Sequence, residues 1–338
     1  MKALGTLRLP TPKLPLKEEM KLSLVIPVYN EENNLLHLYH AIHEALDSIE
    51  LNWKIIFVDD SSTDGSLAVL KELAQKDHRH VQVIVFRRNY GQTAAIAAGI
   101  DHSDGDIVLL MDADMQNDPA DIPIMLAKMD EGYDMVSGWR KNRKDPFLSR
   151  TIPSWIANGL ISWVTGVHLH DYGCTLKAYR REYLSGFRLY GEMHRFIPAY
   201  VHSAGARVAE VVVQHHPRKY GKSKYGLERT LKVLLDLFTV KFLLSFSVSP
   251  IYIFGGVGIG AIFISSVVLL FLAVRRIFFS ISVLGSPFFQ ISVMVFALGF
   301  QTILMGLIAE LLIRTYHETL GKPTYTIREV INEKPGRR

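Results

Sequence analysis

The stretch Asp106–Pro119, DIVLLMDADMQNDP, decides how the fold is interpreted, because an apolar run ends there directly before a group of aspartates. The apolar residues are typical of a buried strand, whereas Asp112, Asp114 and Asp118 carry carboxylates. A carboxylate at the end of a buried element is costly unless a partner or a metal ion neutralises it. The sequence therefore predicts a cationic group at this point of the molecule.

Strand-like and helix-like segments alternate around this stretch. Apolar runs are found at 22–28 (LSLVIPV), 54–60 (KIIFVDD) and 81–86 (VQVIVF), and each is followed by a segment with helical spacing of its apolar residues. Such alternation indicates an α/β domain with a mainly parallel sheet flanked by helices. Ligands bind at the carboxyl ends of the strands in such sheets, so the polar residues that follow each run are expected to converge there.

Asp112, Asp114 and Gln116 alternate along the chain, and alternate residues point to one side if the segment stays extended. Oxygen ligands at this spacing suit Mg²⁺ or Mn²⁺, which commonly bridge substrate phosphates. The alternative is an acidic turn that caps the following helix. That role fits Asp118 and Pro119 but leaves the first two aspartates unexplained. The chain has neither GxxxxGK[ST] nor GxGxxG, so it lacks both of these phosphate-binding loops.

Two segments without a charged residue, Phe242–Val274 and Ile277–Ala309, lie in the C-terminal third. Each exceeds the roughly 20 apolar residues that cross a bilayer. Two transmembrane helices are therefore expected at 247–274 and 287–313, joined by a short extracytoplasmic loop at 275–286. Buried helices of a soluble protein are the weaker alternative, because core helices rarely stay uncharged for so long.

The two spans return the chain to the side that it left, so the α/β domain and the tail at 314–338 are expected on one face. The basic residues that flank this face are Lys232, Lys241, Arg314, Lys322 and Arg328, whereas the far loop contains Arg275 and Arg276. Counting positive charges places the domain in the cytoplasm, although the two loop arginines argue mildly the other way. The net charge of +5 suits contact with anionic membrane lipids. We find no zinc-finger or RNP-type motif, and therefore expect no nucleic acid partner.

The remaining boundaries follow from composition. A Pro-containing flexible lead-in is expected at 1–21, without the apolar core of a signal peptide, and the α/β domain at 22–225. An amphipathic helix at 226–246 is expected to lie in the membrane interface, although an ordinary core helix fits the pattern equally well. The single cysteine, Cys174, excludes an internal disulfide and is interpreted as a packed thiol.

Several motifs resemble those of a known family. VIPVYNEENNL, VDDSSTDGS, RNYGQTAAIAAGI and DADMQNDP resemble the successive motifs of family 2 glycosyltransferases with a GT-A fold. DEGYD, DYGCTLKAYR, RFIP and GKSKY, followed by two spans, are similar to the polyprenyl-phosphate glycosyltransferases, a group that includes dolichyl-phosphate mannose synthases and undecaprenyl-phosphate glucosyltransferases. RNYGQ, DADMQN, DYGC and SKY are most similar to the undecaprenyl-phosphate 4-deoxy-4-formamido-L-arabinose transferases in that group. The resemblance runs from about Leu22 to Arg328.

This resemblance implies metal-dependent, inverting transfer of a single sugar from a nucleotide sugar to undecaprenyl phosphate. The group that the motifs resemble most implies UDP as the carrier nucleotide. The reaction would take place at the cytoplasmic face of a bacterial inner membrane. A GDP-mannose donor stays open, and the sequence is compatible with a homo-oligomer. Processive polysaccharide synthesis is disfavoured because the chain lacks a QxxRW signature. A catalytically inactive nucleotide-sugar-binding scaffold is disfavoured by the intact DxDxQ set.

The same resemblance assigns residues to the donor. Pro27, Tyr29 and Glu31 would line the nucleoside pocket, and Asp60 would accept a hydrogen bond from the base. The catalytic aspartates Asp112 and Asp114 would contact the nucleotide sugar, and together with Gln116 they match the DxDxQ pattern that holds the metal and the diphosphate.

For the acceptor, the phosphate monoester is already largely dianionic near neutral pH, since its second pKa is about 6. It needs a cationic binding site more than a strong base. The resemblance implies that this site consists of Arg140, Arg143, Arg150, Arg218, Lys222, Ser223 and Lys224. The alternative for the run WRKNRK is a solvated surface segment without a role in binding. Asp171 lies where related enzymes carry a base. This sequence departs from the related enzymes nearby, because it has Cys174 and not an acid at the neighbouring position. Asp171 is therefore interpreted as a positioning residue or a weak base.

Overall fold

The computed structural model describes residues 20–141, 158–159, 161–162, 165–184, 189, 193–217, 251–279, 286–319 and 325–332. The chain divides into two compact units, of which one comprises Met1–Val240 with Pro323–Arg338 and the other Lys241–Lys322. The interfacial helix predicted at 226–246 lies outside the described residues, as does nearly all of the lead-in.

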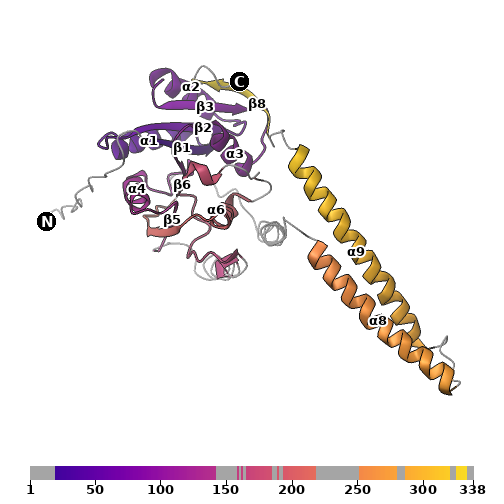
Figure 1. Cartoon of the computed structure of the whole chain (residues 1–338). Helices are drawn as coiled ribbons and strands as arrows, with labels where there is room; N and C mark the ends of the chain where they lie inside the picture. The colour runs from indigo at the N-terminus through magenta and orange to yellow at the C-terminus, as the bar shows by residue number, and fades with distance from the viewer. Residues whose placement is uncertain are drawn as a thin grey trace. The chain divides into compact units, whose positions relative to one another are not determined.

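Within the described residues, one sheet with the strand order β7-β5-β6-β4-β1-β2-β3-β8 forms the centre of the first unit (Figure 1). The strands are β1 (Lys21–Val28), β2 (Asn52–Asp59), β3 (Val81–Phe86), β4 (Ile107–Leu110), β5 (Met135–Trp139), β6 (Lys177–Arg180), β7 (Val208–Val212) and β8 (Ile327–Ile331). β1 to β4 are mutually parallel and β7 is parallel to β5, whereas β6 and β8 run antiparallel to their neighbours. The predicted mainly parallel α/β sheet is confirmed.

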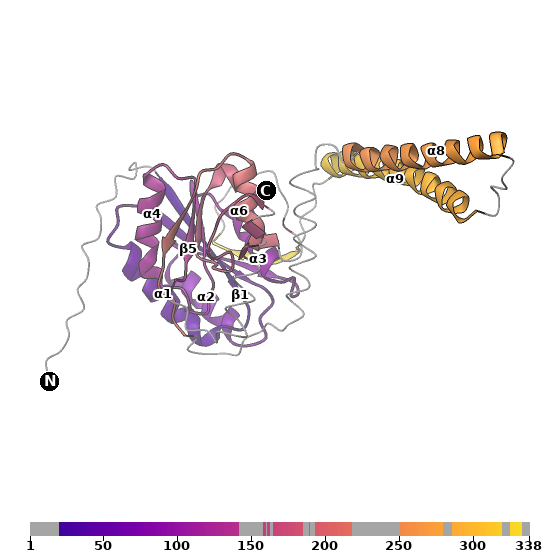
Figure 2. The same ribbon diagram turned by 90° about the horizontal axis from the view of Figure 1, so that it is seen from below.

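Helices cover both faces of this sheet. They are α1 (Glu32–Leu46), α2 (Ser66–Lys76), α3 (Gln92–His102), α4 (Ile122–Asp130) and α6 (Ile197–Ser203), with short 3-10 turns η1 (Pro119–Asp121), η3 (Arg181–Leu184) and η4 (Met193–Phe196). Side chains alternate along a strand, so Ile55 and Phe57 of β2 share a core with α1 and α2, whereas Ile56 packs against α3. Figure 2 shows α1, α2 and α4 together on one side of the sheet and α3 on the other. Burial on both faces explains why the strands are nearly continuous apolar runs.

The loops that follow four parallel strands each reverse through a residue with positive φ. These residues are Asn30 (φ 52°) after β1, Ser61 (59°) after β2, Gly91 (91°) after β3 and Met115 (59°) after β4. Non-glycine residues with positive φ are uncommon and cluster at functional sites. The carboxyl edge of the sheet is therefore a set of sharp turns that present backbone and side-chain polar groups.

The segment after β4 corrects one expectation. β4 ends at Leu110, and the chain then forms a turn in which Met115 is left-handed, so the segment does not stay extended. Asp112, Asp114 and Gln116 therefore do not lie on one side by strand alternation. The capping role of Asp118 is confirmed, because its Oδ1 accepts a hydrogen bond from the Ala120 amide at 3.0 Å and Pro119 begins η1.

The tail contains a strand that the sequence did not indicate. β8 pairs antiparallel with β3 at the edge of the sheet. Tyr325 stacks on Phe86, with ring centroids 5.3 Å apart, and donates a hydrogen bond to Asp101 at 2.8 Å. β7 and β8, which come before and after the second unit in the chain, therefore belong to one sheet.

The second unit is a helical hairpin of α8 (Ile251–Phe279) and α9 (Pro287–Thr319). Segments Phe254–Phe278 and Pro287–Ala309 are long and apolar enough to cross a membrane, with mean hydropathies of 2.7 and 2.2. Large apolar side chains such as Phe263 and Phe271 are exposed, which is expected of a surface that faces lipid. α8 continues beyond the predicted end at Val274, through Arg275 and Arg276.

Candidate active site

The ends of β1 and β2 are tied together by side chains that bond to backbone. The backbone N–H of Asn30 donates to Ser62 Oγ at 3.0 Å, and the side-chain Oδ1 of Asn30 accepts from the backbone N–H of Thr63 at 2.7 Å. The Glu31 amide donates to Ser66 Oγ at 2.9 Å. These contacts hold the YNEEN and DDSSTDGS motifs as one surface. They hold the backbone of Asn30 and Glu31 in place, and the family resemblance predicts that Glu31 and the adjacent Tyr29 line the nucleoside pocket.

Pro27 lies within β1 and pairs in register with Val58. Asp60 lies at the end of β2 and is 3% exposed. Its Oδ1 accepts from the Tyr90 amide at 2.6 Å and its Oδ2 from the Gly91 amide at 2.9 Å. Burial raises the pKa of Asp60, and the two amide bonds act in the opposite direction. The carboxylate therefore anchors the turn that starts α3, and contact with a base stays a prediction.

Asp112 is oriented by two side chains that the sequence did not single out. Its Oδ1 accepts from Gln92 Nε2 at 2.7 Å, and its Oδ2 accepts from the Thr175 hydroxyl at 2.8 Å. Gln92 begins α3 in the motif RNYGQ, and Thr175 follows the motif DYGC, so both lie in stretches that carry the family resemblance. Two separate chain segments thus bond to this one carboxylate.

Asp114 is 7% exposed, and its Oδ1 accepts a hydrogen bond from the backbone N–H of Gln116 at 3.1 Å. The backbone carbonyl of Gln116 accepts from the backbone N–H of His216 at 2.9 Å, which joins this turn to the segment after β7. A carboxylate offers about four lone-pair sites, so these hydrogen bonds are compatible with coordination of a cation. Two carboxylates held in place by outer hydrogen bonds fit a hard divalent ion such as Mg²⁺ or Mn²⁺.

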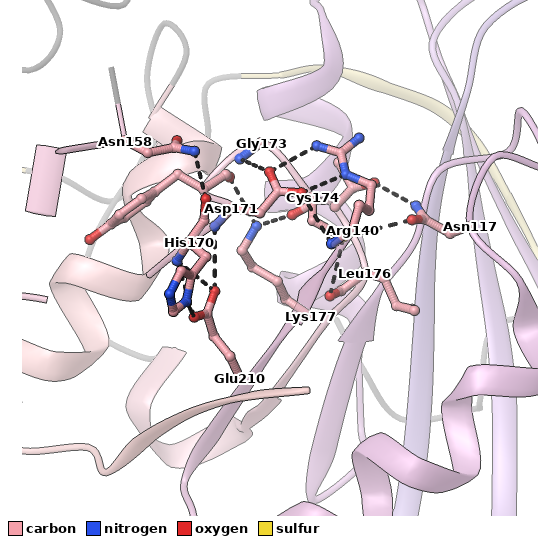
Figure 3. Close-up of polar contacts among 12 residues, drawn as sticks. Asn117, Arg140, Asn158, His170, Asp171, Gly173, Cys174, Leu176, Lys177 and Glu210 are labelled. Carbon is pink, nitrogen blue, oxygen red and sulfur yellow. Dashed lines mark hydrogen bonds and ion pairs between the residues drawn. The ribbon is translucent and has the colours of Figure 1, made fainter. Parts of the chain in front are cut away.

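Arg140 and Asp171 form a two-point ion pair (Figure 3). Arg140 Nε donates to Asp171 Oδ2 at 2.7 Å and an Arg140 terminal nitrogen donates to Oδ1 at 2.9 Å, with side chains only 12% and 4% exposed. Burial acts to lower the pKa of Arg140, but the Asp171 carboxylate outweighs it and raises the pKa. A carboxylate that accepts from a guanidinium on both oxygens is a poor base, so the geometry favours the positioning role for Asp171.

A buried lysine supports the loop that contains this pair (Figure 3). Lys177 Nζ donates to the carbonyls of Tyr172, at 3.1 Å, and of Cys174. Burial lowers the pKa of Lys177 and raises the pKa of the Cys174 thiol, which is fully buried. The thiol lies 3.7 Å from Asn117 Oδ1. A buried thiol with a raised pKa is inert, in agreement with a packing role.

Glu210 of β7 forms hydrogen bonds with His170, the residue that precedes Asp171. His170 Nδ1 lies 2.8 Å from Glu210 Oε2, and the His170 amide donates to the same carboxylate. The His170 ring stacks on Trp139, with centroids 4.1 Å apart. Nothing in the sequence pattern indicated this support. The remaining predicted acceptor residues, Arg143, Arg150, Arg218, Lys222, Ser223 and Lys224, lie outside the described residues.

The sequence of this chain is similar to those of known proteins. Residues 23–187 match the model of glycosyl transferase family 2. The chain is 39% identical over 320 residues to a dodecaprenyl-phosphate galacturonate synthase of Rhizobium johnstonii, covering 94% of this chain and 95% of the relative. It is 37% identical over 314 residues to an undecaprenyl-phosphate 4-deoxy-4-formamido-L-arabinose transferase of Proteus mirabilis, covering 93% and 95%.

Among solved structures, glucosyl-3-phosphoglycerate synthase from Mycobacterium tuberculosis, in complex with Mn²⁺, UDP-glucose and phosphoglyceric acid, superposes with a TM-score of 0.50. The identity is 17%, and the match covers 67% of this chain and 81% of that chain, so this likeness shows the fold alone. Fold and comparisons together define a glycosyltransferase with a GT-A-like domain. The chain belongs to glycosyltransferase family 2, in its polyprenyl-phosphate glycosyltransferase group, and the expected family membership is confirmed.

Proposed function

We propose that this protein transfers one sugar from a nucleotide sugar to a polyprenyl phosphate of the undecaprenyl or dodecaprenyl class. The observation that carries the proposal is identity of 37–39% to two such enzymes over more than nine-tenths of the chain. The two long apolar helices in the same chain as the GT-A-like domain also suit an enzyme that acts on a lipid-linked acceptor. The polyprenyl tail stays in the bilayer while the phosphate reaches the catalytic edge.

On the donor side, the pocket is the carboxyl edge of β1, β2 and β4. Tyr29 and Glu31 line the nucleoside site together with Pro27, and Asp60 holds the turn beside it. Asp112, Asp114 and Gln116 would hold Mg²⁺ or Mn²⁺, and Gln92 and Thr175 keep Asp112 oriented. The divalent ion, when bound, stabilises the departing nucleoside diphosphate.

On the acceptor side, Arg140 offers a preorganised positive charge. A guanidinium has five N–H donors, so the two-point pair with Asp171 does not exhaust its capacity to bind phosphate. The acceptor is largely a dianion at neutral pH and attacks the anomeric carbon without a strong base. In-line attack inverts the anomeric configuration. In this mechanism Asp171 fixes the guanidinium. The residues that complete the acceptor site are Arg143, Arg150, Arg218, Lys222, Ser223 and Lys224.

For location, we place the GT-A-like domain, 22–225 together with β8, on the cytoplasmic side of a bacterial inner membrane, with the hairpin of α8 and α9 spanning it. The apolar hairpin and the membership of β8 in the sheet of the domain support this topology. UDP is the proposed carrier nucleotide, with a GDP-mannose donor as the alternative that the experiment below decides.

The test uses the detergent-solubilised full chain with undecaprenyl phosphate and a panel of labelled nucleotide sugars, and measures label in the lipid phase. One UDP-sugar is expected to label a lipid-linked monosaccharide in a divalent-ion-dependent manner. Asp114→Asn should lower the rate by about 100-fold or more, because a metal-holding carboxylate is lost. The matched control is Asp106→Asn at the opposite end of β4, whose exposed carboxylate accepts from the Lys21 amide and should tolerate the change. Full transfer after complete chelation, or polymer as product, would refute the proposal.

A further inference from the structure

A second polar cluster lies at the amino edge of the sheet, away from the carboxyl edge that holds the active site. His43 is in the last turn of α1, Asp77 follows α2 as its C-cap, and His80 directly precedes β3. The three residues thus come from the end of α1 and from the connection between α2 and β3. Nothing in the proposed sugar transfer uses them.

The potential ligand atoms of this cluster are close together. His43 Nε2 lies 3.2 Å from Asp77 Oδ2, and His80 Nδ1 lies 3.1 Å from both Asp77 oxygens. All three groups offer one ligand atom within 4.8 Å of the others. Zn–N bonds of about 2.0–2.1 Å in a tetrahedron put neighbouring ligand atoms about 3.3 Å apart. The two His–Asp separations of 3.2 and 3.1 Å are close to such edges.

A second carboxylate supports His43 from outside the cluster. His43 Nδ1 lies 3.0 Å from Asp47 Oδ2, and the other ring nitrogen, Nε2, faces Asp77. A carboxylate that holds the outer nitrogen of a ligating histidine is the usual support of a zinc site.

Aromatic neighbours fix both rings. Trp53 stacks on His80, with centroids 4.1 Å apart and 20° between the planes, and meets His43 edge-on at 4.8 Å. The Tyr39 hydroxyl donates to Asp77 Oδ2 at 3.1 Å. The side chains of His43, Asp77 and His80 retain 21%, 12% and 19% exposure, which leaves a path for an ion from solvent.

We propose that His43, Asp77 and His80 bind a divalent transition-metal ion of the Zn²⁺ class, with Asp47 as the outer support of His43. Two imidazoles and a carboxylate favour Zn²⁺, Co²⁺ or Ni²⁺ over the hard ions that suit the catalytic aspartates. The ion joins the ends of α1 and α2 to the start of β3. With three protein ligands, a water molecule completes the tetrahedron. The ion leaves the chemistry at the opposite edge of the sheet unchanged.

The test is a titration of the full chain, free of any polyhistidine tag and in excess Mg²⁺, with Zn²⁺ against a competing chelator and with Co²⁺ followed by visible absorption. The chain should bind one equivalent, give the intense bands of tetrahedral Co²⁺, and unfold at a higher temperature with Zn²⁺. His80→Gln should abolish these effects. Asp47→Asn, on an exposed side chain that does not endanger folding, should weaken Zn²⁺ binding by about 10–100-fold. His37→Gln, an exposed histidine of the same helix, is the matched control and should bind as the unmodified chain does.

Absence of a one-equivalent site in the unmodified chain would overturn the proposal and leave a proton-sharing cluster in its place. Equal Zn²⁺ binding by His80→Gln, Asp47→Asn and His37→Gln would also overturn it, because the ion would then bind elsewhere.

Discussion

Arg140 and Asp171 bind each other through two parallel hydrogen bonds of 2.7 and 2.9 Å, although 31 residues separate them in the chain. Arg140 directly follows β5, and Asp171 lies in the loop that leads to β6. The Gly173 amide donates to Asp171 at 3.1 Å, and an added Cβ at Gly173 would lie 3.2 Å from the guanidinium. The pair is therefore held from several sides, and the guanidinium has one orientation.

The first prediction separates positioning from base catalysis at this pair. Asp171→Asn should lower kcat/KM by about 10–100-fold, because a small displacement of a substrate-binding group is enough for such a loss. The shape of the pH–rate profile should stay unchanged, since Asp171 carries no proton in the reaction. Initial rates from pH 5 to pH 9 provide the measurement.

Arg140→Lys is the companion variant, since it keeps the charge but removes the planar fork that Asp171 binds. It should resemble Asp171→Asn in kcat/KM. Loss of the acidic limb of the profile in Asp171→Asn alone would instead identify the carboxylate as the base.

The order of strands and helices could be predicted because it depends on local patterns. The run predicted at 81–86 coincides with β3, and that at 22–28 differs from β1 by one residue. The convergence of Asp60 and Asp112 at one edge follows from the parallel topology. Asp118 was assigned to a cap because the Asp-Pro pair has a local mechanism.

The rest depends on interactions that no local pattern contains. The left-handed Met115 turns the DADMQ segment, whereas its residue type gives no sign of positive φ. The orientation of Asp112 by Gln92 and Thr175 requires contacts across 20 and 63 residues. The pairing of β8 with β3 joins segments about 245 residues apart, which only the folded sheet reveals.

The tail strand gives the second prediction. Tyr325 is 8% exposed, stacks on Phe86 and bonds to Asp101, and the adjacent Thr326 carbonyl accepts from the Arg87 amide at 3.1 Å. Tyr325→Ala should destabilise the GT-A-like domain by about 2–4 kcal/mol, since a buried ring is lost. Tyr325→Phe removes only the hydroxyl contact and should cost about 1 kcal/mol.

Urea unfolding of the solubilised chain measures both values. Hydrogen exchange of the β3 amides should increase in Tyr325→Ala, because the edge of the sheet loses its partner. Unchanged exchange in β3 would show that β8 stays paired without this ring.

The third prediction concerns pH and Asp134, which is 5% exposed and precedes β5. Burial acts to raise its pKa, but hydrogen bonds and charge from Arg207, with Arg180, prevail and lower the pKa below the ordinary 3.8. An acid with a lowered folded-state pKa contributes stability above its unfolded pKa, and the contribution is lost as the pH falls through the folded value. Asp134→Asn should therefore destabilise the protein at pH 7 by about 1 kcal/mol, a value reduced for the exposure of Arg207.

The difference between the unmodified chain and Asp134→Asn should shrink as the pH falls below about 4. Urea unfolding at pH 7, 5 and 3.5 tests this dependence. Glu72→Gln, which removes one partner of the exposed Lys76 pair, is the control and should show no measurable change. A constant difference at all three pH values would assign the effect to packing instead of charge.

The last prediction concerns the apolar hairpin, in which Gly258 of α8 and Gly299 of α9 approach each other reciprocally. A Cβ added at Gly258 would lie 2.6 Å from the Gly299 carbonyl oxygen, and one added at Gly299 would lie 2.8 Å from the Gly258 carbonyl oxygen. Small residues allow such backbone contact between helices in lipid, where packing replaces the hydrophobic effect. Gly258→Ala should therefore separate the helices and destabilise the hairpin by about 1–3 kcal/mol. Gly256→Ala is the matched control, because a Cβ there meets no atom within 4 Å. Thermal unfolding in detergent should give a lower Tm for Gly258→Ala and an unchanged Tm for Gly256→Ala, whereas equal values would mean that this contact does not hold the hairpin together.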